Sequence, residues 1–121
     1  MTERFVKNQD YYLDTKTNLE WSIENYGPMT WHEAVEKFDG SSGWRLPTIE
    51  ELLTLIDYSL YEPSTELPGM LSSFYWSSTT NANGTGNAWG VYFDGGYGYG
   101  DYKDYCNYVR AVRGEGRIKN D

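Results

Sequence analysis

Apolar side chains recur at every second position near the start of the chain, and this alternation predicts a β-hairpin over residues 4–23. The second half of that segment carries Leu19, Trp21 and Ile23, which are separated by single polar residues. Such spacing is typical of a strand with one buried face. Residues 14–18, Asp-Thr-Lys-Thr-Asn, are turn-forming types and separate this run from an earlier apolar one.

Two short segments with helical spacing follow, and each begins with a capping box, in which a threonine caps the first turn and a glutamate three residues later reaches back to it. Thr30 and Glu33 form the first capping box, and Thr48 and Glu51 form the second. An apolar stripe follows each box, consisting of Ala34, Val35 and Phe38 in the first case and of Leu52, Leu53, Leu55 and Ile56 in the second. The sequence therefore predicts two short helices.

The second half of the chain predicts strands separated by loops. In order, we expect an ordered loop over residues 58–74, a strand over 75–79, a loop over 80–87, a strand through 89–93, a hairpin turn at 94–96, a last strand over 108–113 and a frayed tail over 115–121. Helices and antiparallel strands in separate stretches of chain indicate the α+β class.

The strand through 89–93 has a clear alternation of side chains. Trp89, Val91 and Phe93 share one face, which we expect to be buried in the core. The opposite face, which we expect to meet solvent, carries Gly90, Tyr92 and Asp94.

Charge and length narrow the classes of function. The chain has 10 Lys+Arg against 18 Asp+Glu, a net charge of -8 at pH 7. That balance opposes binding to nucleic acids and insertion at anionic lipid surfaces. The length fits a single domain over residues 1–121, and no change of composition marks a linker. We expect neither a secretory signal nor a membrane-spanning segment, because no apolar run reaches the roughly 18–20 residues that span a bilayer.

Few residues are available for site chemistry. Cys106 is the single cysteine and His32 the single histidine, so a disulfide within the chain and a cysteine-rich zinc site are excluded. We expect no cofactor and no metal site. Arg45, Arg110 and Arg113 are expected to pair with carboxylates and to hold loops. The location of the protein stays open, with a virion or a cell surface included.

Four motifs rich in aromatic and apolar residues occur in a fixed order. They are residues 44–52 (Trp-Arg-Leu-Pro-Thr-Ile-Glu-Glu-Leu), 75–79 (Tyr-Trp-Ser-Ser-Thr), 88–93 (Ala-Trp-Gly-Val-Tyr-Phe) and 109–113 (Val-Arg-Ala-Val-Arg). Together they resemble the Lcl C-terminal domain family, which is named for the C-terminal domain of a bacterial collagen-like adhesin. The resemblance covers about residues 4–114. It implies a C-type-lectin-like fold with two short helices, a terminal β-hairpin and antiparallel strands with long loops.

Two departures limit what this resemblance implies about activity. Formylglycine-generating enzymes share the implied fold but use a pair of active-site cysteines, and this chain has one cysteine. The sugar-binding triplets of calcium-dependent lectins are also missing, since the nearest fragment, Glu62-Pro63-Ser64, lacks the amide. Neither the oxidase chemistry nor lectin-type calcium binding is therefore expected.

Residues 94–107 have a restricted composition, because every residue except Lys103 is Asp, Gly, Tyr, Cys or Asn. Each of these types is reached from an asparagine codon by changing its adenines. The segment 81–107 thus resembles the variable region of proteins diversified by retroelements, which mutagenise adenines near the 3′ end of a gene. This resemblance implies a fixed scaffold, residues 4–80 and 108–114, and a rewritten surface over 81–107.

The same composition suggests how the surface would act. Tyr, Gly, Asn and Asp dominate antibody paratopes, and tyrosine offers a large contact area with a polar tip. The leading interpretation is a non-enzymatic binding module for a protein or glycan partner. We expect this partner to contact Asn83, Gly90, Tyr92, Asp94, Tyr97, Tyr99, Asp101, Tyr102, Asp104, Tyr105, Cys106 and Asn107.

Two other interpretations remain open at this point. The tyrosine-rich surface could instead be a structural contact, through which the domain forms oligomers or docks onto a larger fibre. A hydrolase would need two carboxylates with separated pKa values, and Asp101 and Asp104 are the candidates. These acids lie in a segment that we expect to be exposed, where large pKa shifts do not arise. We therefore expect no enzyme.

Overall fold

The computed structural model describes residues 3–114, and the tail predicted over 115–121 lies outside the described residues. The described chain has an α+β fold in which strands predominate. In chain order the elements are β1 (Phe5–Lys7), β2 (Tyr11–Asp14), β3 (Glu20–Ser22), β4 (Tyr26–Met29), α1 (Trp31–Lys37), α2 (Ile49–Leu53), β5 (Phe74–Thr80), β6 (Asn87–Tyr92), β7 (Tyr97–Tyr102), β8 (Asn107–Val109) and β9 (Val112–Arg113).

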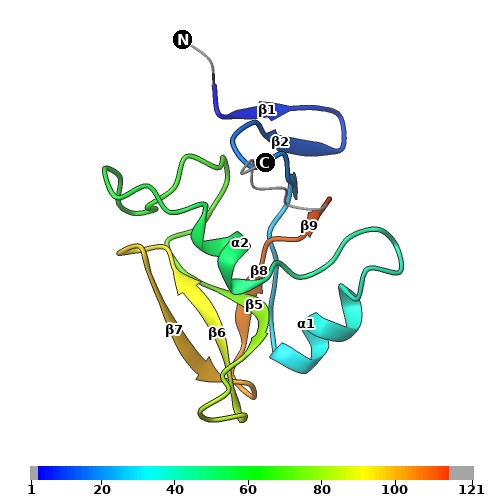
Figure 1. Ribbon diagram of the computed structural model, residues 1–121, viewed down its shortest axis with the longest axis vertical. Coiled ribbons are helices and arrows are strands. Elements are labelled where there is room, and N and C mark those ends of the chain that lie inside the picture. Colours follow the sequence, from blue (N-terminus) through cyan, green and yellow to red (C-terminus); the bar gives the residue numbers. More distant parts are fainter. Residues whose placement is uncertain (1–2, 115–121) are drawn as a thin grey trace, which may run out of the picture.

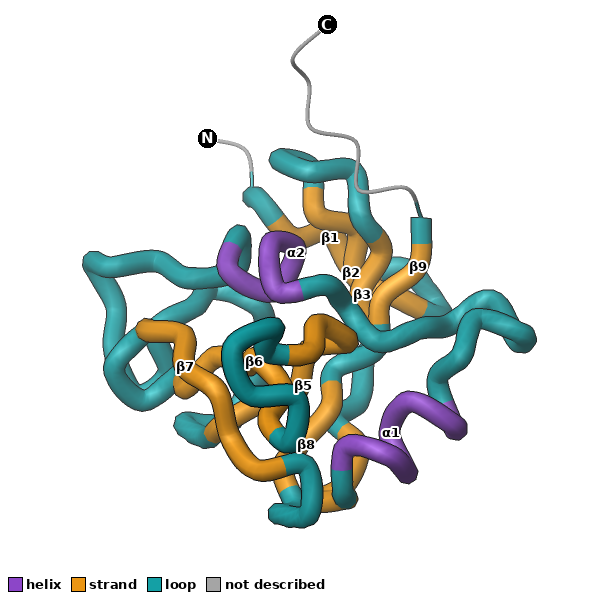
Figure 2. Tube along the Cα trace, turned by 60° about the horizontal axis from the view of Figure 1, so that its bottom comes forward, coloured by secondary structure: helices purple, strands orange, loops and turns teal. Residues whose placement is uncertain are grey.

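The strands form two sheets. A four-stranded sheet has the order β1-β2-β3-β9, and a five-stranded sheet has the order β4-β8-β5-β6-β7. β5 and β8 run parallel, while the other neighbours pair antiparallel. In Figure 1, β1 and β2 lie at one end of the molecule, β5, β6 and β7 lie at the other, and α2 lies between them. Figure 2 shows α1 beside β8, on the side away from β7.

Both predicted helices are present, and both begin with the predicted capping boxes. The Glu33 carboxylate accepts a hydrogen bond from the Thr30 N–H at 2.9 Å, and the Thr30 hydroxyl accepts one from the Glu33 N–H at 3.3 Å. Thr48 and Glu51 make the same exchange at 2.9 and 3.2 Å. These contacts satisfy backbone N–H groups that a helix start leaves without partners. Local sequence therefore determines where each helix begins.

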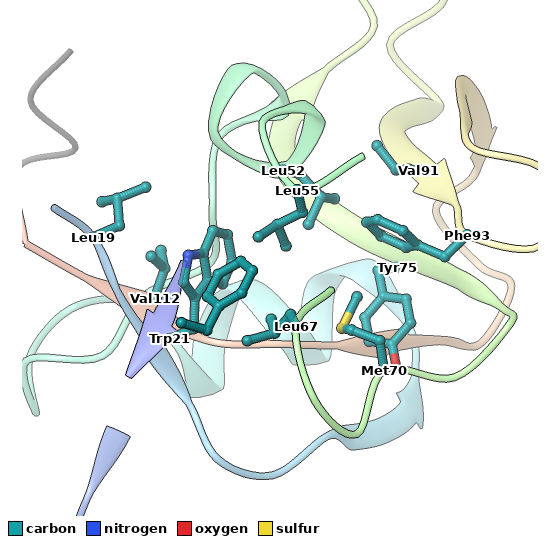
Figure 3. Packing of buried hydrophobic residues seen from close by; sticks show 11 residues of the cluster. Leu19, Trp21, Leu52, Leu55, Leu67, Met70, Tyr75, Val91, Phe93 and Val112 are labelled. Atoms are coloured by element: carbon teal, nitrogen blue, oxygen red, sulfur yellow. The ribbon is translucent and has the colours of Figure 1, made fainter. Parts of the chain in front are cut away.

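The main core lies between the two sheets. Figure 3 shows Leu52 of α2 and Leu55, which follows this helix, with Trp21 and Val112 of the four-stranded sheet on one side. On the other side lie side chains of the five-stranded sheet. The buried members of this cluster are Phe5, Leu19, Trp21, Leu52, Leu55, Leu67, Met70, Tyr75, Val91, Phe93 and Val112. A second cluster lies under α1, on the opposite face of the five-stranded sheet, and includes Ala34, Phe38, Phe74, Trp76, Ala88 and Val109.

The antiparallel pairing predicted over residues 4–23 is present, but the segment forms three successive strands instead of a two-stranded hairpin. β1 pairs with β2, and β2 pairs with β3. Asp14 ends β2 with a buried carboxylate that accepts two hydrogen bonds from the Arg4 guanidinium, both at 2.9 Å. It also accepts the Thr17 hydroxyl at 2.9 Å and the Lys16 N–H at 2.9 Å. This carboxylate therefore holds the turn that leads into β3.

The single strand predicted over 108–113 is wrong, because the chain there is divided between the sheets. β8 belongs to the five-stranded sheet and β9 to the four-stranded one. The chain crosses at Arg110, whose side chain is fully buried. Its guanidinium donates to the carbonyl oxygens of Ser22 at 2.6 Å, Ile23 at 3.1 Å and Pro68 at 2.9 Å. These bonds join the crossing to both neighbouring segments.

The expected carboxylate partners are present for two of the three arginines. Arg45 makes a bidentate pair with Glu51 at 2.7 and 2.8 Å, and Arg113 donates to Glu20 at 2.6 Å. The expectation for Arg110 is wrong, because no carboxylate of residues 3–114 lies within ion-pair distance of it. Backbone carbonyl groups take that place. Burial lowers the pKa of Arg110 to about 10.

Candidate binding surface

The β6–β7 hairpin at the edge of the five-stranded sheet carries most of the predicted binding residues. Its register is unbroken from its open end to Tyr92↔Tyr97 next to the turn. Residues paired across two strands lie on the same face of a sheet. Tyr97, Tyr99 and Asp101 of β7 therefore share one face with Tyr92 and Gly90 of β6. The helix α1 covers this face only near β8 and leaves the β6–β7 end uncovered (Figure 2).

Three tyrosine rings on this face contact one another, and we call Tyr92, Tyr97 and Tyr99 the tyrosine cluster. The ring centroids of Tyr92 and Tyr97 lie 5.6 Å apart, and those of Tyr97 and Tyr99 lie 5.8 Å apart. Tyr97 remains 51% exposed and Tyr99 38% exposed. Beneath them, the buried Phe74 ring packs against Tyr99 at 4.7 Å. The cluster is thus an exposed aromatic surface that rests on a core residue.

Gly90 makes this arrangement possible, although it does not face solvent as predicted. The residue is buried, and a Cβ atom at this position would overlap both the Phe74 ring and the carbonyl oxygen of Tyr75. The missing side chain lets Phe74 lie across β6 and reach Tyr99. Trp89, predicted to be in the core, is half-buried instead. The predicted alternation fails here because β6 is an interior strand with material packed on both faces.

The turn after β7 extends the surface. The rings of Tyr102 and Tyr105 meet edge to face at 5.3 Å, and both side chains are exposed. Asp104 and Cys106 are exposed in the same turn, and Asn107 is half-buried at the start of β8. The last residue of β7, Tyr102, and the four predicted residues after this strand thus lie in one continuous segment beside the hairpin.

Lys103 fixes this turn to the scaffold. Its ammonium group donates to the Thr80 hydroxyl at 3.1 Å and lies 4.1 Å from the centroid of the Trp31 ring. Its backbone N–H donates to the Gly86 carbonyl at 3.0 Å, and its carbonyl accepts the Trp31 N–H at 3.1 Å. One residue therefore connects the turn to α1, to β5 and to the loop that precedes β6.

The remaining predicted residues lie around this surface. Asn83 is exposed in the loop before β6, and Asp94 is half-buried at the hairpin turn. Asp101 is half-buried, and its carboxylate accepts the Tyr102 N–H and the Asn107 side-chain amide, both at 3.0 Å. It therefore joins the end of β7 to the start of β8.

The electrostatics of the surface are those of an acidic, aromatic patch. Burial raises the pKa of Tyr99, and the negative charge of Asp101 raises it further, with smaller effects from Tyr97 and Tyr92. Between Arg45 and Arg110 the chain has eight carboxylate residues and a single cation, Lys103. The ammonium group of that lysine is already bound to Thr80 and Trp31. Three of the eight, Asp94, Asp101 and Asp104, lie in the segment that forms this surface, against the one lysine.

Two strongly exposed tyrosines were not among the predicted binding residues. Tyr58 is 82% exposed and Tyr61 is 76% exposed, and both lie in the loop between α2 and β5. Ser64 of this loop donates from its N–H to the Phe93 carbonyl at 2.8 Å, which places the loop beside the hairpin turn. The signal that would have found these residues is two aromatic side chains in a segment without any apolar periodicity.

The described residues also bear on metal sites, free thiols and membrane-spanning helices. Within residues 3–114 no group of three or more His, Cys, Asp or Glu side chains is arranged to hold a metal ion. Cys106 is a free thiol on the surface. Among the described helices, none is long and apolar enough to cross a membrane.

Comparison with known proteins identifies the family. The chain matches the model of the Lcl C-terminal domain over residues 10–113, which spans the elements from β2 to β9. No curated protein and no solved structure matches the chain significantly. Because the match covers most of the chain, the protein belongs to the Lcl C-terminal domain family.

Proposed function

We propose that this domain is a non-enzymatic, adhesin-like binding module with a C-type-lectin-like arrangement. Its binding surface consists of the β6–β7 hairpin and the turn over residues 103–106, and its partner is a protein or a glycan. The observation that carries the proposal is the tyrosine cluster, which is exposed and yet held in place by Phe74. Family membership supports it, because the family is named for a domain of an adhesin.

The geometry of the cluster suits recognition. Tyrosine rings that already touch one another lose little conformational freedom when a partner covers them, so less binding energy is spent on ordering them. Aromatic residues are also frequent among the few side chains that dominate binding energy. The Phe74 ring below Tyr99 limits how far that ring can move. These features favour a preorganised contact surface over a flexible one.

The arrangement also supports diversification by a retroelement. Lys103 is the one residue of 94–107 outside the set reached from asparagine codons. It is also the residue whose side chain fixes the turn to Thr80 and Trp31. A residue that fixes the turn, as Lys103 does, would have to stay constant while its neighbours changed. The DNA around the gene tests this idea, since a near-copy of the 3′ segment with adenines at the variable codons is expected beside a reverse transcriptase. Without such a copy, the surface is a fixed one.

The binding function is tested with paired tyrosine variants. Tyr97→Ser combined with Tyr99→Ser removes the two exposed rings of the tyrosine cluster. The matched control, Tyr58→Ser with Tyr61→Ser, removes two rings that are even more exposed, from a different element. Immobilised wild-type and variant domains are compared for binding to glycan arrays and to arrays of surface polypeptides. We expect ligands of the wild type to be lost by the first variant and kept by the control.

Two results would contradict this function. Equal retention of ligands by the cluster variant and the wild type would show that the tyrosines do not form the contact. Concentration-dependent oligomers in size-exclusion chromatography, abolished by the cluster variant, would identify the surface as an assembly contact instead.

A further inference from the structure

The outer edge of β7 is open. Within the described residues β7 has β6 as its strand neighbour on one side and no strand on the other. The Lys103 N–H, next after β7, donates to Gly86 on the β6 side. Backbone groups of successive residues in a strand point in alternate directions, and the register of this pair is unbroken. The N–H and C=O groups of Gly98 and Gly100 therefore point outward from the sheet.

This edge lacks most of the devices that normally prevent strand addition. Native edge strands are protected by charged side chains, above all lysine, by proline, by β-bulges or by a covering segment, and β7 carries one charge, that of Asp101. β7 has the sequence Tyr-Gly-Tyr-Gly-Asp-Tyr and no bulge in its register. The nearest lysine, Lys103, lies beyond the strand with its ammonium group over Trp31. Gly98 is exposed and Gly100 is half-buried. The outward groups at Gly98 are thus the more accessible to another backbone.

The two faces beside this edge differ in character. On one face lie Tyr97, Tyr99 and the carboxylate of Asp101. On the other face, α2 packs over the glycines, with Leu53 Cδ2 at 3.5 Å and Ile49 Cδ1 at 4.0 Å from the Cβ position of Gly98. Leu53 is 40% exposed. Side chains of an added strand would alternate between an acidic, aromatic face and an apolar one.

We propose that β7 binds an extended, basic polypeptide segment as an additional strand of the five-stranded sheet. Lysine or arginine side chains of this segment lie against Tyr97, Tyr99 and Asp101, and apolar side chains alternate with them and lie against Leu53. The inference rests on the proposed binding function and names the class of its partner. Backbone hydrogen bonds to an edge strand provide affinity, and alternate side chains provide specificity.

Charge selects this partner over two others. The segment 81–107 has three carboxylates, those of Asp94, Asp101 and Asp104, and one lysine, whose ammonium group is already bound to Thr80. Basic side chains are attracted to that field, and they also bind the faces of tyrosine rings. A second copy of this chain would bring the same carboxylates to the edge, and a sulfated glycan would bring further negative charge. Both are repelled.

The test uses synthetic peptides and the isotope-labelled domain. The probe is an end-capped peptide of alternating lysine and valine, about as long as β7. Its controls are the same peptide with glutamate in place of lysine and the same peptide N-methylated at its central residues. On the protein, Gly98→Pro removes the outward N–H. The matched variant Gly98→Ala keeps it, and its methyl group would lie 3.4 Å from the Gly90 carbonyl oxygen, an ordinary contact distance.

We expect the lysine peptide to change the amide NMR signals of Gly98 and Gly100 most and to slow their hydrogen exchange. N-methylation of the peptide and the Gly98→Pro substitution should each weaken binding about tenfold or more, because main-chain hydrogen bonds are lost. Gly98→Ala, which keeps the outward N–H, should weaken binding less than Gly98→Pro does. The glutamate peptide should bind about tenfold more weakly or not at all, and added salt should weaken the lysine peptide.

Three results would overturn the inference. Equal binding of the N-methylated peptide to the wild-type domain would mean that charge alone attracts it, and this result does not depend on the folding of any variant. Equal binding of the glutamate peptide would remove the charge argument. Failure of the lysine peptide to bind at millimolar concentration would exclude the edge as a docking strand. If the tyrosine variants still lose their ligands in that case, the binding function stands and only the strand-addition mode fails.

Discussion

Replacing Gly90 by alanine tests whether the tyrosine cluster depends on the absence of a side chain at this position, where the Phe74 ring crosses β6. The added methyl group would overlap the Phe74 ring and the backbone carbonyl oxygen of Tyr75. The ring has little room to move, since its centroid lies 5.5 Å from that of Trp76 on one side and 4.7 Å from that of Tyr99 on the other. Either the ring or the paired strands must therefore shift.

The size of the effect follows from these contacts. Overpacking a core by one methyl group costs about 1–3 kcal/mol, and a clash with the backbone places Gly90→Ala at the upper end, about 3 kcal/mol. For a domain of this length, that corresponds to a fall of roughly 12 °C in Tm. Gly98 on the paired strand provides a matched control, because the methyl group of Gly98→Ala would meet its neighbours at 3.4 and 3.5 Å. That variant should be as stable as the wild type or about 0.5 kcal/mol more stable.

Urea unfolding followed by tryptophan fluorescence measures both variants. The midpoint should fall for Gly90→Ala and stay in place for Gly98→Ala, with similar slopes for all three proteins. The NMR signals of the Tyr99 ring should also move in Gly90→Ala, because Phe74 is displaced beneath it. A Gly90→Ala protein that unfolds within about 0.5 kcal/mol of the wild type would refute the idea that this glycine makes room for the cluster.

Three further predictions concern charged groups. Arg110→Met leaves three carbonyl groups without donors, and we expect a loss of about 3–5 kcal/mol in urea unfolding. Burial raises the pKa of Asp14, but the hydrogen bonds and charge of Arg4 outweigh it, so the pKa lies below the ordinary 3.8. The stability from this ion pair is therefore complete above that value and lost as the pH falls through the lower, folded-state pKa. Asp14→Asn should flatten the dependence of the urea midpoint on pH in this acid range. Asp101→Asn removes a charge that raises the pKa of Tyr99, so this phenol should ionise at lower pH in an NMR titration.

Each of these predictions has a clear contrary result. Arg110→Met with the stability of the wild type would mean that its carbonyl partners find other donors or water. An Asp14→Asn protein with the same acid dependence as the wild type would assign the acid loss to other carboxylates. A Tyr99 pKa unchanged by Asp101→Asn would mean that the charge of Asp101 does not raise it.

Local patterns in the sequence predicted the elements whose formation is local. Both capping boxes lie within four residues of chain, and both helices begin where these boxes predict. The strand β4 was missed because Gly27 and Pro28 interrupt any alternation in Tyr26–Met29. That strand forms by pairing with β8, far along the chain. Pairing over such a distance leaves no periodic trace in the short segment itself.

The candidate surface was predicted in composition and only partly in geometry. The exposed tyrosines of β7 and of the turn after it were found, because few other residue types occur there. Gly90 was predicted to face solvent but is buried, because the alternation of side chains does not reveal that Phe74 crosses β6. Arg110 was expected to meet a carboxylate. Its carbonyl partners come together only when the chain crosses between the sheets.

The crossing at Arg110 also has a consequence for synthesis of the protein. β8 pairs with β4 and β5, and β9 pairs with β3, so neither sheet is complete until residues 107–113 have left the ribosome. The segment 81–107, which holds the proposed binding surface, is made just before them. A frameshift or stop codon within it therefore removes both closing strands as well. We therefore expect truncated or frame-shifted chains not to fold, because they lack the strands that complete both sheets.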